Sequence, residues 1–262
     1  MRKEAILKSP LKDPPFRQPG QSLGEEIQRV FEEDWMPYYL ATLLFCVFAA
    51  LEWWRFYRPI PPSPRLVTAM AVLMLGITAI RMYRMRPNIR NLRLGMEGEK
   101  VVGQLLEELR ANGAAVFHDI CAKDFKVDHV VVSPKGIFVI ETKTRSKPTG
   151  TRVAVRYDGE KVYVNGNTPS RDPIKQVLAI SAWVQELVKK STGKSFPVRP
   201  VVLFPGWYVE TENANAHDRV WVLNPKCLVS FIQHEKIDLP PEDVNLITFH
   251  LSRYIRSENL VH

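Results

Sequence analysis

Apolar and polar positions divide the chain into two regions of different character. In the first region, residues 35–54 and 66–80 form two long apolar runs, and Glu52 is the charge inside them. Beyond residue 94, shorter apolar segments recur with the spacing of single helices and strands, beginning with a helix that is expected to open at Gly95 and stop near residue 112. The pattern predicts an apolar helical hairpin followed by one α/β domain.

The two apolar runs have the length and borders of membrane-spanning helices. A helix needs about 20 apolar residues to cross a hydrocarbon layer of about 30 Å. The first run meets this length, and the second does so if Arg81 extends its charge towards the interface. We expect spans at 35–56 and 65–83, joined by a Pro-rich link; the alternative is a buried hairpin in a soluble protein. Aromatic residues border the first run, as is typical of membrane interfaces: Trp35, Tyr38, Tyr39, Trp53, Trp54 and Tyr57.

The distribution of arginine predicts how this hairpin lies in a membrane. Three arginines flank the link, whereas five follow the second run and more precede the first. Because Lys and Arg favour the cytoplasmic side, both chain ends are expected there. The predicted location is the inner or plasma membrane of a prokaryote, as a multi-pass protein. Residues 1–34 would form a cytoplasmic tail, and residues 84–94 a basic linker beside the lipid headgroups.

Charge distribution and motif content give no support to several other classes of function. Residues 1–94 hold 14 Lys and Arg against 8 Asp and Glu, so most of the net charge of +8 lies in the membrane-proximal region and does not by itself indicate nucleic-acid binding. The three cysteines, Cys46, Cys121 and Cys227, have neither disulfide nor zinc spacing. The sequence also contains no nucleotide-binding glycine loop and no Ser-His-Asp set.

Charged residues stand beside two apolar strands in the middle of the chain. Residues 127–132 and 137–140 flank a turn and predict a β-hairpin covered on both faces. Asp128 lies near the start of the first strand, and Glu141 and Lys143 share one face at the end of the second. Two carboxylates on adjacent strands suit Mg²⁺ or Mn²⁺, and a lysine beside them can orient water for phosphodiester hydrolysis. The alternative is a solvated ion pair at the strand end, with Asp128 as a turn residue.

A basic segment follows these strands. Residues 152–155 and 161–164 predict a second hairpin close to the acidic residues. A basic hairpin in this place could hold a phosphate backbone, and the alternative is an ordinary solvated hairpin. The candidate nucleic-acid contacts are Arg145, Lys147, Arg152 and Arg156.

Three motifs resemble a known family. The order of a helix with a Gly-x-x-x-Glu start, a strand, an Asp-bearing strand and a Glu-x-Lys strand resembles the PD-(D/E)XK nucleases. More narrowly, GMEGEKVVGQLLEEL, VDHVVVSPKGIFVIETKT and DPIKQ resemble the nuclease-related domain called NERD, over residues 95–204. The resemblance implies an α/β fold with a restriction-endonuclease-like core, a mixed central sheet flanked by helices, within a domain of residues 95–262.

The resemblance also implies roles for individual residues. Asp128 and Glu141 match the metal-binding acids, and Lys143 matches the catalytic lysine. Glu99 matches a helix acid that completes the metal site or braces the lysine, and Gln176 matches a glutamine placed near the site. The expected function is metal-dependent cleavage of nucleic acid, DNA before RNA. The alternative is a membrane-tethered module that binds nucleic acid or acts as a scaffold without hydrolysis; a third hypothesis assigns the function to the membrane segment, as a sensor or assembly element.

Overall fold

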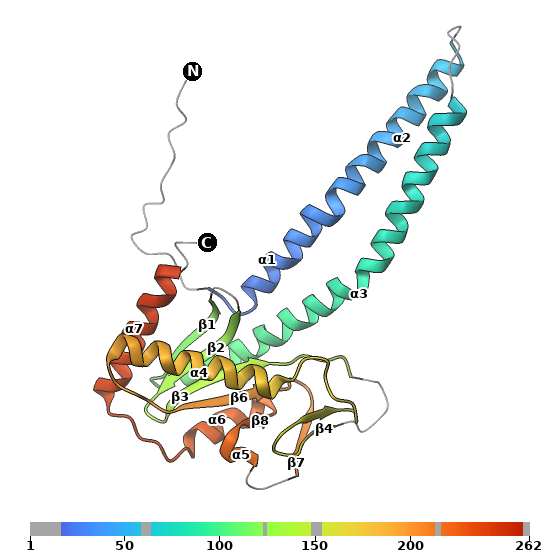
Figure 1. The fold of residues 1–262 in the computed structure, drawn as a ribbon. Helices are drawn as coiled ribbons and strands as arrows, with labels where there is room; N and C mark the ends of the chain where they lie inside the picture. The colour runs from blue at the N-terminus through green and yellow to red at the C-terminus, as the bar shows by residue number, and fades with distance from the viewer. Residues whose placement is uncertain (1–16, 59–63, 123–124, 148–153, 213–215, 259–262) are drawn as a thin grey trace, which may run out of the picture. The chain divides into compact units, whose positions relative to one another are not determined.

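A computed structural model describes residues 17–58, 64–122, 125–147, 154–212 and 216–258 of the chain (Figure 1). These residues form two compact units. One unit is Ser22–Leu94, and the other contains the described residues from Gly95 onward together with residues 17–21.

The first unit is built from long helices. Helix α1 (Gln21–Arg29) runs through a π-helical segment (Val30–Trp35) into α2 (Met36–Phe56), and α3 (Pro64–Ala111) follows. Within the described part of the chain, two helices are long and apolar enough to cross a membrane. Little of the most apolar stretch of each helix is buried, 6% in the first and 11% in the second. Large apolar side chains along α2 are exposed, among them Leu40, Leu43, Leu44, Val47, Phe48 and Leu51.

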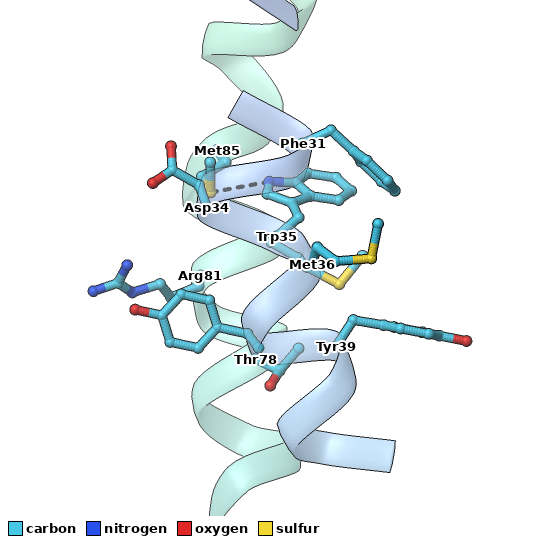
Figure 2. Close-up of a pocket in the computed structure, with 10 residues that line it drawn as sticks. Phe31, Asp34, Trp35, Met36, Tyr39, Thr78, Arg81 and Met85 are labelled. Atoms are coloured by element: carbon cyan, nitrogen blue, oxygen red, sulfur yellow. Dashed lines mark hydrogen bonds between the residues drawn. The ribbon is translucent and has the colours of Figure 1, made fainter. Parts of the chain in front are cut away.

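Polar contacts hold α2 and α3 together as an antiparallel pair. The hydroxyls of Thr42 and Thr78 lie 2.6 Å apart, and both side chains are buried. At one end of the pair, Nε1 of Trp35 donates to Sδ of Met85 at 3.0 Å (Figure 2). Beside this contact is a hollow of about 220 Å³, where the Arg81 guanidinium lies 4.5 Å from the ring centre of Tyr38.

The course of α3 differs from the helix that was predicted to begin at Gly95. A helix start at Gly95 is wrong, because α3 continues without a break from Pro64 to Ala111 and includes the whole segment 84–94. Pro87 lies inside the helix, where it removes one backbone donor without ending the helix. Two arginines and two leucines lie among the seven residues that follow it, and both residue types favour helix.

The second unit is organised around a five-stranded mixed sheet. Its strands are β1 (Ala115–Cys121), β2 (Lys126–Ser133), β3 (Gly136–Thr142), β6 (Val198–Leu203) and β8 (Trp221–Leu223), in that spatial order. Strands β1, β2 and β3 pair antiparallel, whereas β3, β6 and β8 pair parallel. This confirms the mixed sheet and the central hairpin predicted from the sequence.

Helices cover both faces of this sheet. Helices α4 (Pro173–Thr192) and α7 (Pro241–Glu258) bury their apolar faces in one core, and α4 is seen crossing the sheet in Figure 1. The last turns of α3 and helix α6 (Pro225–Gln233) contribute to the core on the opposite face. Strand β3 is therefore buried along its whole length, which explains its almost continuous apolar sequence.

The second unit also contains a smaller, three-stranded sheet. It contains β5 (Val162–Val164), β4 (Ala154–Tyr157) and β7 (Tyr208–Thr211), with β4 and β5 forming the expected second hairpin. A short helix, α5 (Ala216–Arg219), precedes β8. Residues 148–153, which include the predicted contact Arg152, lie outside the described part of the chain.

Candidate active site

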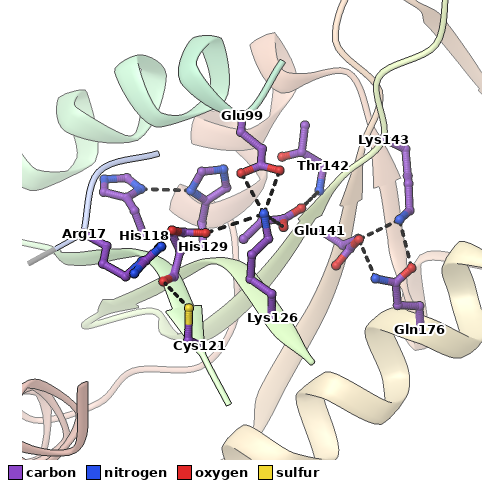
Figure 3. A network of polar contacts seen from close by, with 12 residues as sticks. Arg17, Glu99, His118, Cys121, Lys126, His129, Glu141, Thr142, Lys143 and Gln176 are labelled. Carbon is purple, nitrogen blue, oxygen red and sulfur yellow. Dashed lines mark hydrogen bonds and ion pairs between the residues drawn. The ribbon is translucent and has the colours of Figure 1, made fainter. Parts of the chain in front are cut away.

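Three side chains from β3, the residue after it, and α4 meet at one end of the sheet. Nζ of Lys143 donates to Oε1 of Glu141 at 2.6 Å and to Oε1 of Gln176 at 2.8 Å. Nε2 of Gln176 donates to Oε1 of Glu141 at 2.7 Å, which closes the triangle (Figure 3). The structure thus brings together three of the predicted site residues, two of which are 35 positions apart in the sequence.

The start of α4 fixes the position of Gln176. Asp172 caps this helix by accepting hydrogen bonds from the backbone N–H groups of Ile174 and Lys175, and Pro173 occupies the first turn. A capping carboxylate and an N-terminal proline both favour a helix start at this position. Gln176 therefore leaves the first turn of a well-defined helix and reaches the end of β3.

Asp128 lies across the strand pair from Glu141. The β2–β3 register pairs His129 with Ile140, and one further step in the same register sets Asp128 opposite Glu141. Directly opposed residues point to the same face of a sheet, with Cβ atoms about 5 Å apart. Oδ2 of Asp128 also accepts a hydrogen bond from the backbone N–H of Thr142 at 2.8 Å. Both acids are buried, so they form a cross-strand carboxylate pair.

Burial changes the charge balance of this pair. Desolvation, followed by the nearby negative charge of Asp128, raises the pKa of Glu141 to about 8 from its ordinary 4.5. Desolvation likewise raises the pKa of Asp128, although the charge of Lys126 and the hydrogen bond from Thr142 oppose the shift. Raised pKa values mean that these two acids favour their protonated form unless a nearby positive charge stabilises the carboxylates.

Lys126 brings three acids together in the same region. Its Nζ lies 3.1 and 3.2 Å from the two carboxylate oxygens of Glu99, 3.5 Å from Oδ1 of Asp119 and 3.6 Å from Oδ1 of Asp128 (Figure 3). Glu99 is thus bound by Lys126. Desolvation, then the charge of Asp128, raises the pKa of Glu99 to about 7.

Asp119 has a strained backbone in the middle of β1. Its φ is +51°, a left-handed conformation that is uncommon outside glycine. This residue breaks the alternation of the strand, because Phe117 and Ile120 both pack in the same core. The Asp119 carboxylate is fully buried and accepts a hydrogen bond from Nε of Arg17 at 2.7 Å.

Sequence reasoning missed both Lys126 and Asp119. Asp119 could have been found in the same way as Asp128, because each is a charged residue within an apolar strand. Lys126 could have been found because it precedes Asp128 by two positions, a spacing that places two side chains on one face of a regular strand.

Close packing joins α3 to the segment that bears Lys143. A Cβ atom added at Gly98 would lie 1.8 Å from Oγ1 and 2.9 Å from Cβ of Thr144. The helix can approach this segment only because position 98 has no side chain. The same approach places Glu99, the next residue, within reach of Lys126.

The predicted basic residues occupy different surroundings. Arg145 and Lys147 are exposed just beyond β3, whereas Arg156 on β4 forms an ion pair with Glu212. A pocket of about 110 Å³ opens beside Lys143, and its lining includes Arg145, Ser170 and Arg171. Arg171 was not predicted; it lies just before the cap of α4, where no sequence pattern marked it.

The donor set fits a hard divalent cation. No group of three or more His, Cys, Asp and Glu side chains within the described ranges is arranged to hold a metal ion. Mg²⁺, however, commonly binds one or two protein carboxylates and completes its shell with water and phosphate oxygens. Asp128 and Glu141, two buried acids with raised pKa values, meet that requirement.

A known protein family matches the part of the chain that carries this site. Residues 94–205 match the family model described as nuclease-related domain, NERD. No curated protein matches the chain. The solved structure of Pyrococcus furiosus SfsA in complex with Ca²⁺ is 14% identical with a TM-score of 0.26; the match covers 48% of this chain and 55% of that one. The chain thus spans about half the length of that structure, and a likeness so low supports no conclusion. The matched residues 94–205 contain the predicted motifs from Glu99 to Gln176, so this part of the chain is similar to the nuclease-related domain family.

Proposed function

We propose that this protein is a divalent-metal-dependent nuclease that hydrolyses phosphodiester bonds, with DNA as the expected substrate, and that two helices anchor it in a membrane. The observation that carries the proposal is the triangle of Glu141, Lys143 and Gln176 beside the carboxylate of Asp128. Two acids that can hold a divalent cation and an amine beside them are groups that metal-assisted phosphodiester hydrolysis can use.

Each residue has a role in this chemistry. Asp128 and Glu141 would hold Mg²⁺ or Mn²⁺, which supplies a polarised phosphoryl oxygen and a more acidic water when bound. Lys143 would orient the attacking water and offset the negative charge that develops on phosphate. Gln176 holds both the acid and the amine in position, and Glu99 would assist as a further buried acid near Asp128.

The basic surroundings support nucleic acid as the substrate. Arg145 and Arg171 line the pocket next to Lys143, so positive charge adjoins the acidic pair on one side. Arginine binds phosphate oxygens through a planar fork of donors. These residues, with Lys147, Arg156 and Arg152, are candidates for backbone contacts, which position a nucleic acid without reading its sequence.

The anchor proposal rests on the exposed apolar surface of the hairpin. The exposed leucines and phenylalanines of α2, together with Val47, would be stable in lipid and costly in water. Trp53 and Trp54 lie near one end of the hairpin and Trp35 near the other, as in interfacial belts. Both chain ends would then face the cytoplasm, with the plasma membrane of a prokaryote as the proposed location.

A cleavage assay with full-length protein in detergent tests the enzyme. The variants Asp128→Asn and Lys143→Met are compared with Asp243→Asn and Lys194→Met, a matched pair that forms an ion pair elsewhere in the domain. We expect Mg²⁺- or Mn²⁺-dependent cleavage that falls about 100-fold or more in the site variants and is unchanged in the controls. Equal cleavage by all proteins would reject the enzyme, and retained nucleic-acid binding without any cleavage would favour the catalytically silent module.

A further inference from the structure

We propose that Lys126 is the resident counter-ion of the acidic residues at this site, and that a divalent cation binds Asp128 in competition with the Lys126 ammonium group. This inference rests on the proposed metal-dependent function. It assigns to Lys126 a control of metal binding that the family motifs do not describe.

Lys126 is surrounded by acids from three different elements. Glu99 comes from α3, Asp119 from β1 and Asp128 from β2, and each has a carboxylate oxygen between 3.1 and 3.6 Å from Nζ of Lys126. The side chains of these acids are at most 6% exposed. An ammonium group has three N–H donors, so one lysine can serve three carboxylates at once.

Burial makes this cation necessary in the metal-free protein. Isolated carboxylates in an apolar environment are strongly unfavourable, and they require either a partner or a bound proton. Carboxylate oxygens of Glu99, Asp119 and Asp128 lie within 3.6 Å of Nζ of Lys126, and nearby negative charges favour the charged form of a lysine. Lys126 is therefore a permanent positive charge inside this group of acids.

Metal and ammonium compete for Asp128 for reasons of distance and charge. Mg²⁺ binds carboxylate oxygens at about 2.0–2.1 Å. An ion bound to Asp128 would therefore lie close to the Lys126 ammonium group, and the two positive charges would repel each other. The Lys126 side chain is 25% exposed, unlike the acids around it. Its flexible four-carbon stem allows the ammonium to withdraw towards solvent when a divalent ion replaces it. Metal binding should accordingly release Lys126.

Mn²⁺ binding to the purified full-length protein, followed by electron paramagnetic resonance, tests the competition. We expect Lys126→Met to bind Mn²⁺ about 10-fold more tightly than the wild type, because the binding-competent fraction rises when the competing amine is removed. Lys135→Met is the matched control, since Lys135 lies in the β2–β3 turn near Asp238, and its affinity should be unchanged. Equal or weaker binding by Lys126→Met would overturn the inference.

Asp128→Asn separates this inference from the proposed function. If Asp128→Asn binds Mn²⁺ as the wild type does, the proposed metal site itself fails. If Asp128→Asn loses binding while Lys126→Met is unchanged, the metal site stands and the competition is wrong.

A second measurement requires no substitution at Lys126. Acylation of amines in the wild-type protein, quantified by mass spectrometry, reports how accessible each lysine is. We expect Mn²⁺ to increase the acylation of Lys126 severalfold and to leave Lys135 unchanged. An unchanged Lys126 rate at Mn²⁺ saturation would overturn the inference even if Lys126→Met does not fold.

Discussion

Gln176 donates from its side-chain nitrogen to Oε1 of Glu141 at 2.7 Å, and its side-chain oxygen accepts from Lys143 at 2.8 Å. A single amide thus orients one acid and one amine of the site. Because the two ends of the amide differ, a carboxylate at position 176 could accept from Lys143 but could not donate to an ionised Glu141.

Replacing this amide should weaken the site. In Gln176→Ala, Glu141 loses a buried donor, so the free energy of unfolding should fall by about 1–3 kcal/mol and nuclease activity should fall with it. Gln185→Ala is the control, since Gln185 on the same helix donates to the backbone oxygen of Phe196. Chemical denaturation and cleavage rates measure both effects. Loss of activity in both variants to the same degree would contradict a specific role for Gln176.

The buried acids should make the metal-free protein less stable as pH rises. Glu141 has a pKa of about 8 in the folded state against an ordinary 4.5. Between these values the folded state holds a proton that the unfolded state releases, so the free energy of unfolding decreases with increasing pH. This contribution is complete below about pH 4.5 and is lost by about pH 8. Glu99, with a pKa of about 7, acts in the same direction.

Denaturant midpoints from pH 5 to pH 9 in a chelator measure this slope. Glu141→Gln should flatten it, because an amide does not titrate. Glu186→Gln, which alters an exposed residue of α4 paired with Lys190, should retain it. A saturating divalent cation should also flatten the slope in the wild type. Identical slopes for Glu141→Gln and the wild type would argue against a raised pKa at this acid.

Arg17 should stabilise the second unit through Asp119. The two side chains are 15% and 0% exposed, and removing one partner of such a buried pair costs about 3–5 kcal/mol. Arg17→Ala should therefore lower the unfolding midpoint strongly, whereas Arg156→Ala, which breaks an exposed pair with Glu212, should cost less than about 1 kcal/mol. The double variant Arg17→Met with Asp119→Asn should recover part of the loss. No recovery would mean that Arg17 acts through another contact.

Gly98 should not tolerate a side chain. Gly98→Ala should destabilise the domain by about 1–3 kcal/mol, because the new Cβ overlaps Thr144. Thr144→Ala removes the overlapping hydroxyl and should restore part of the stability. Gly76→Ala in the same helix is the control, since nothing lies within 4 Å of the added Cβ. Thermal unfolding measures all three. A neutral Gly98→Ala would show that α3 can move away from Thr144 without cost.

Much of the fold could be predicted from local sequence patterns. Valine and isoleucine runs around a Pro-Lys-Gly turn are enough to predict the β2–β3 hairpin, since side-chain size and turn chemistry act over a few residues. Asp128, Glu141 and Lys143 could be predicted as site residues because they are charged residues beside these apolar strands. The helix start at Gly95 was wrong because two glycines weaken a helix without ending it when both flanks are helical.

The sequence by itself determined the hairpin with Asp128, Glu141 and Lys143, and the apolar helices before it, because these follow from periodicity and charge within short segments. Tertiary structure alone decided that Lys126 gathers Glu99, Asp119 and Asp128, and that Arg17 reaches Asp119. Those contacts join residues up to 102 positions apart. They depend on strand register, on a left-handed residue in β1 and on the close approach of α3, none of which has a local sequence signal.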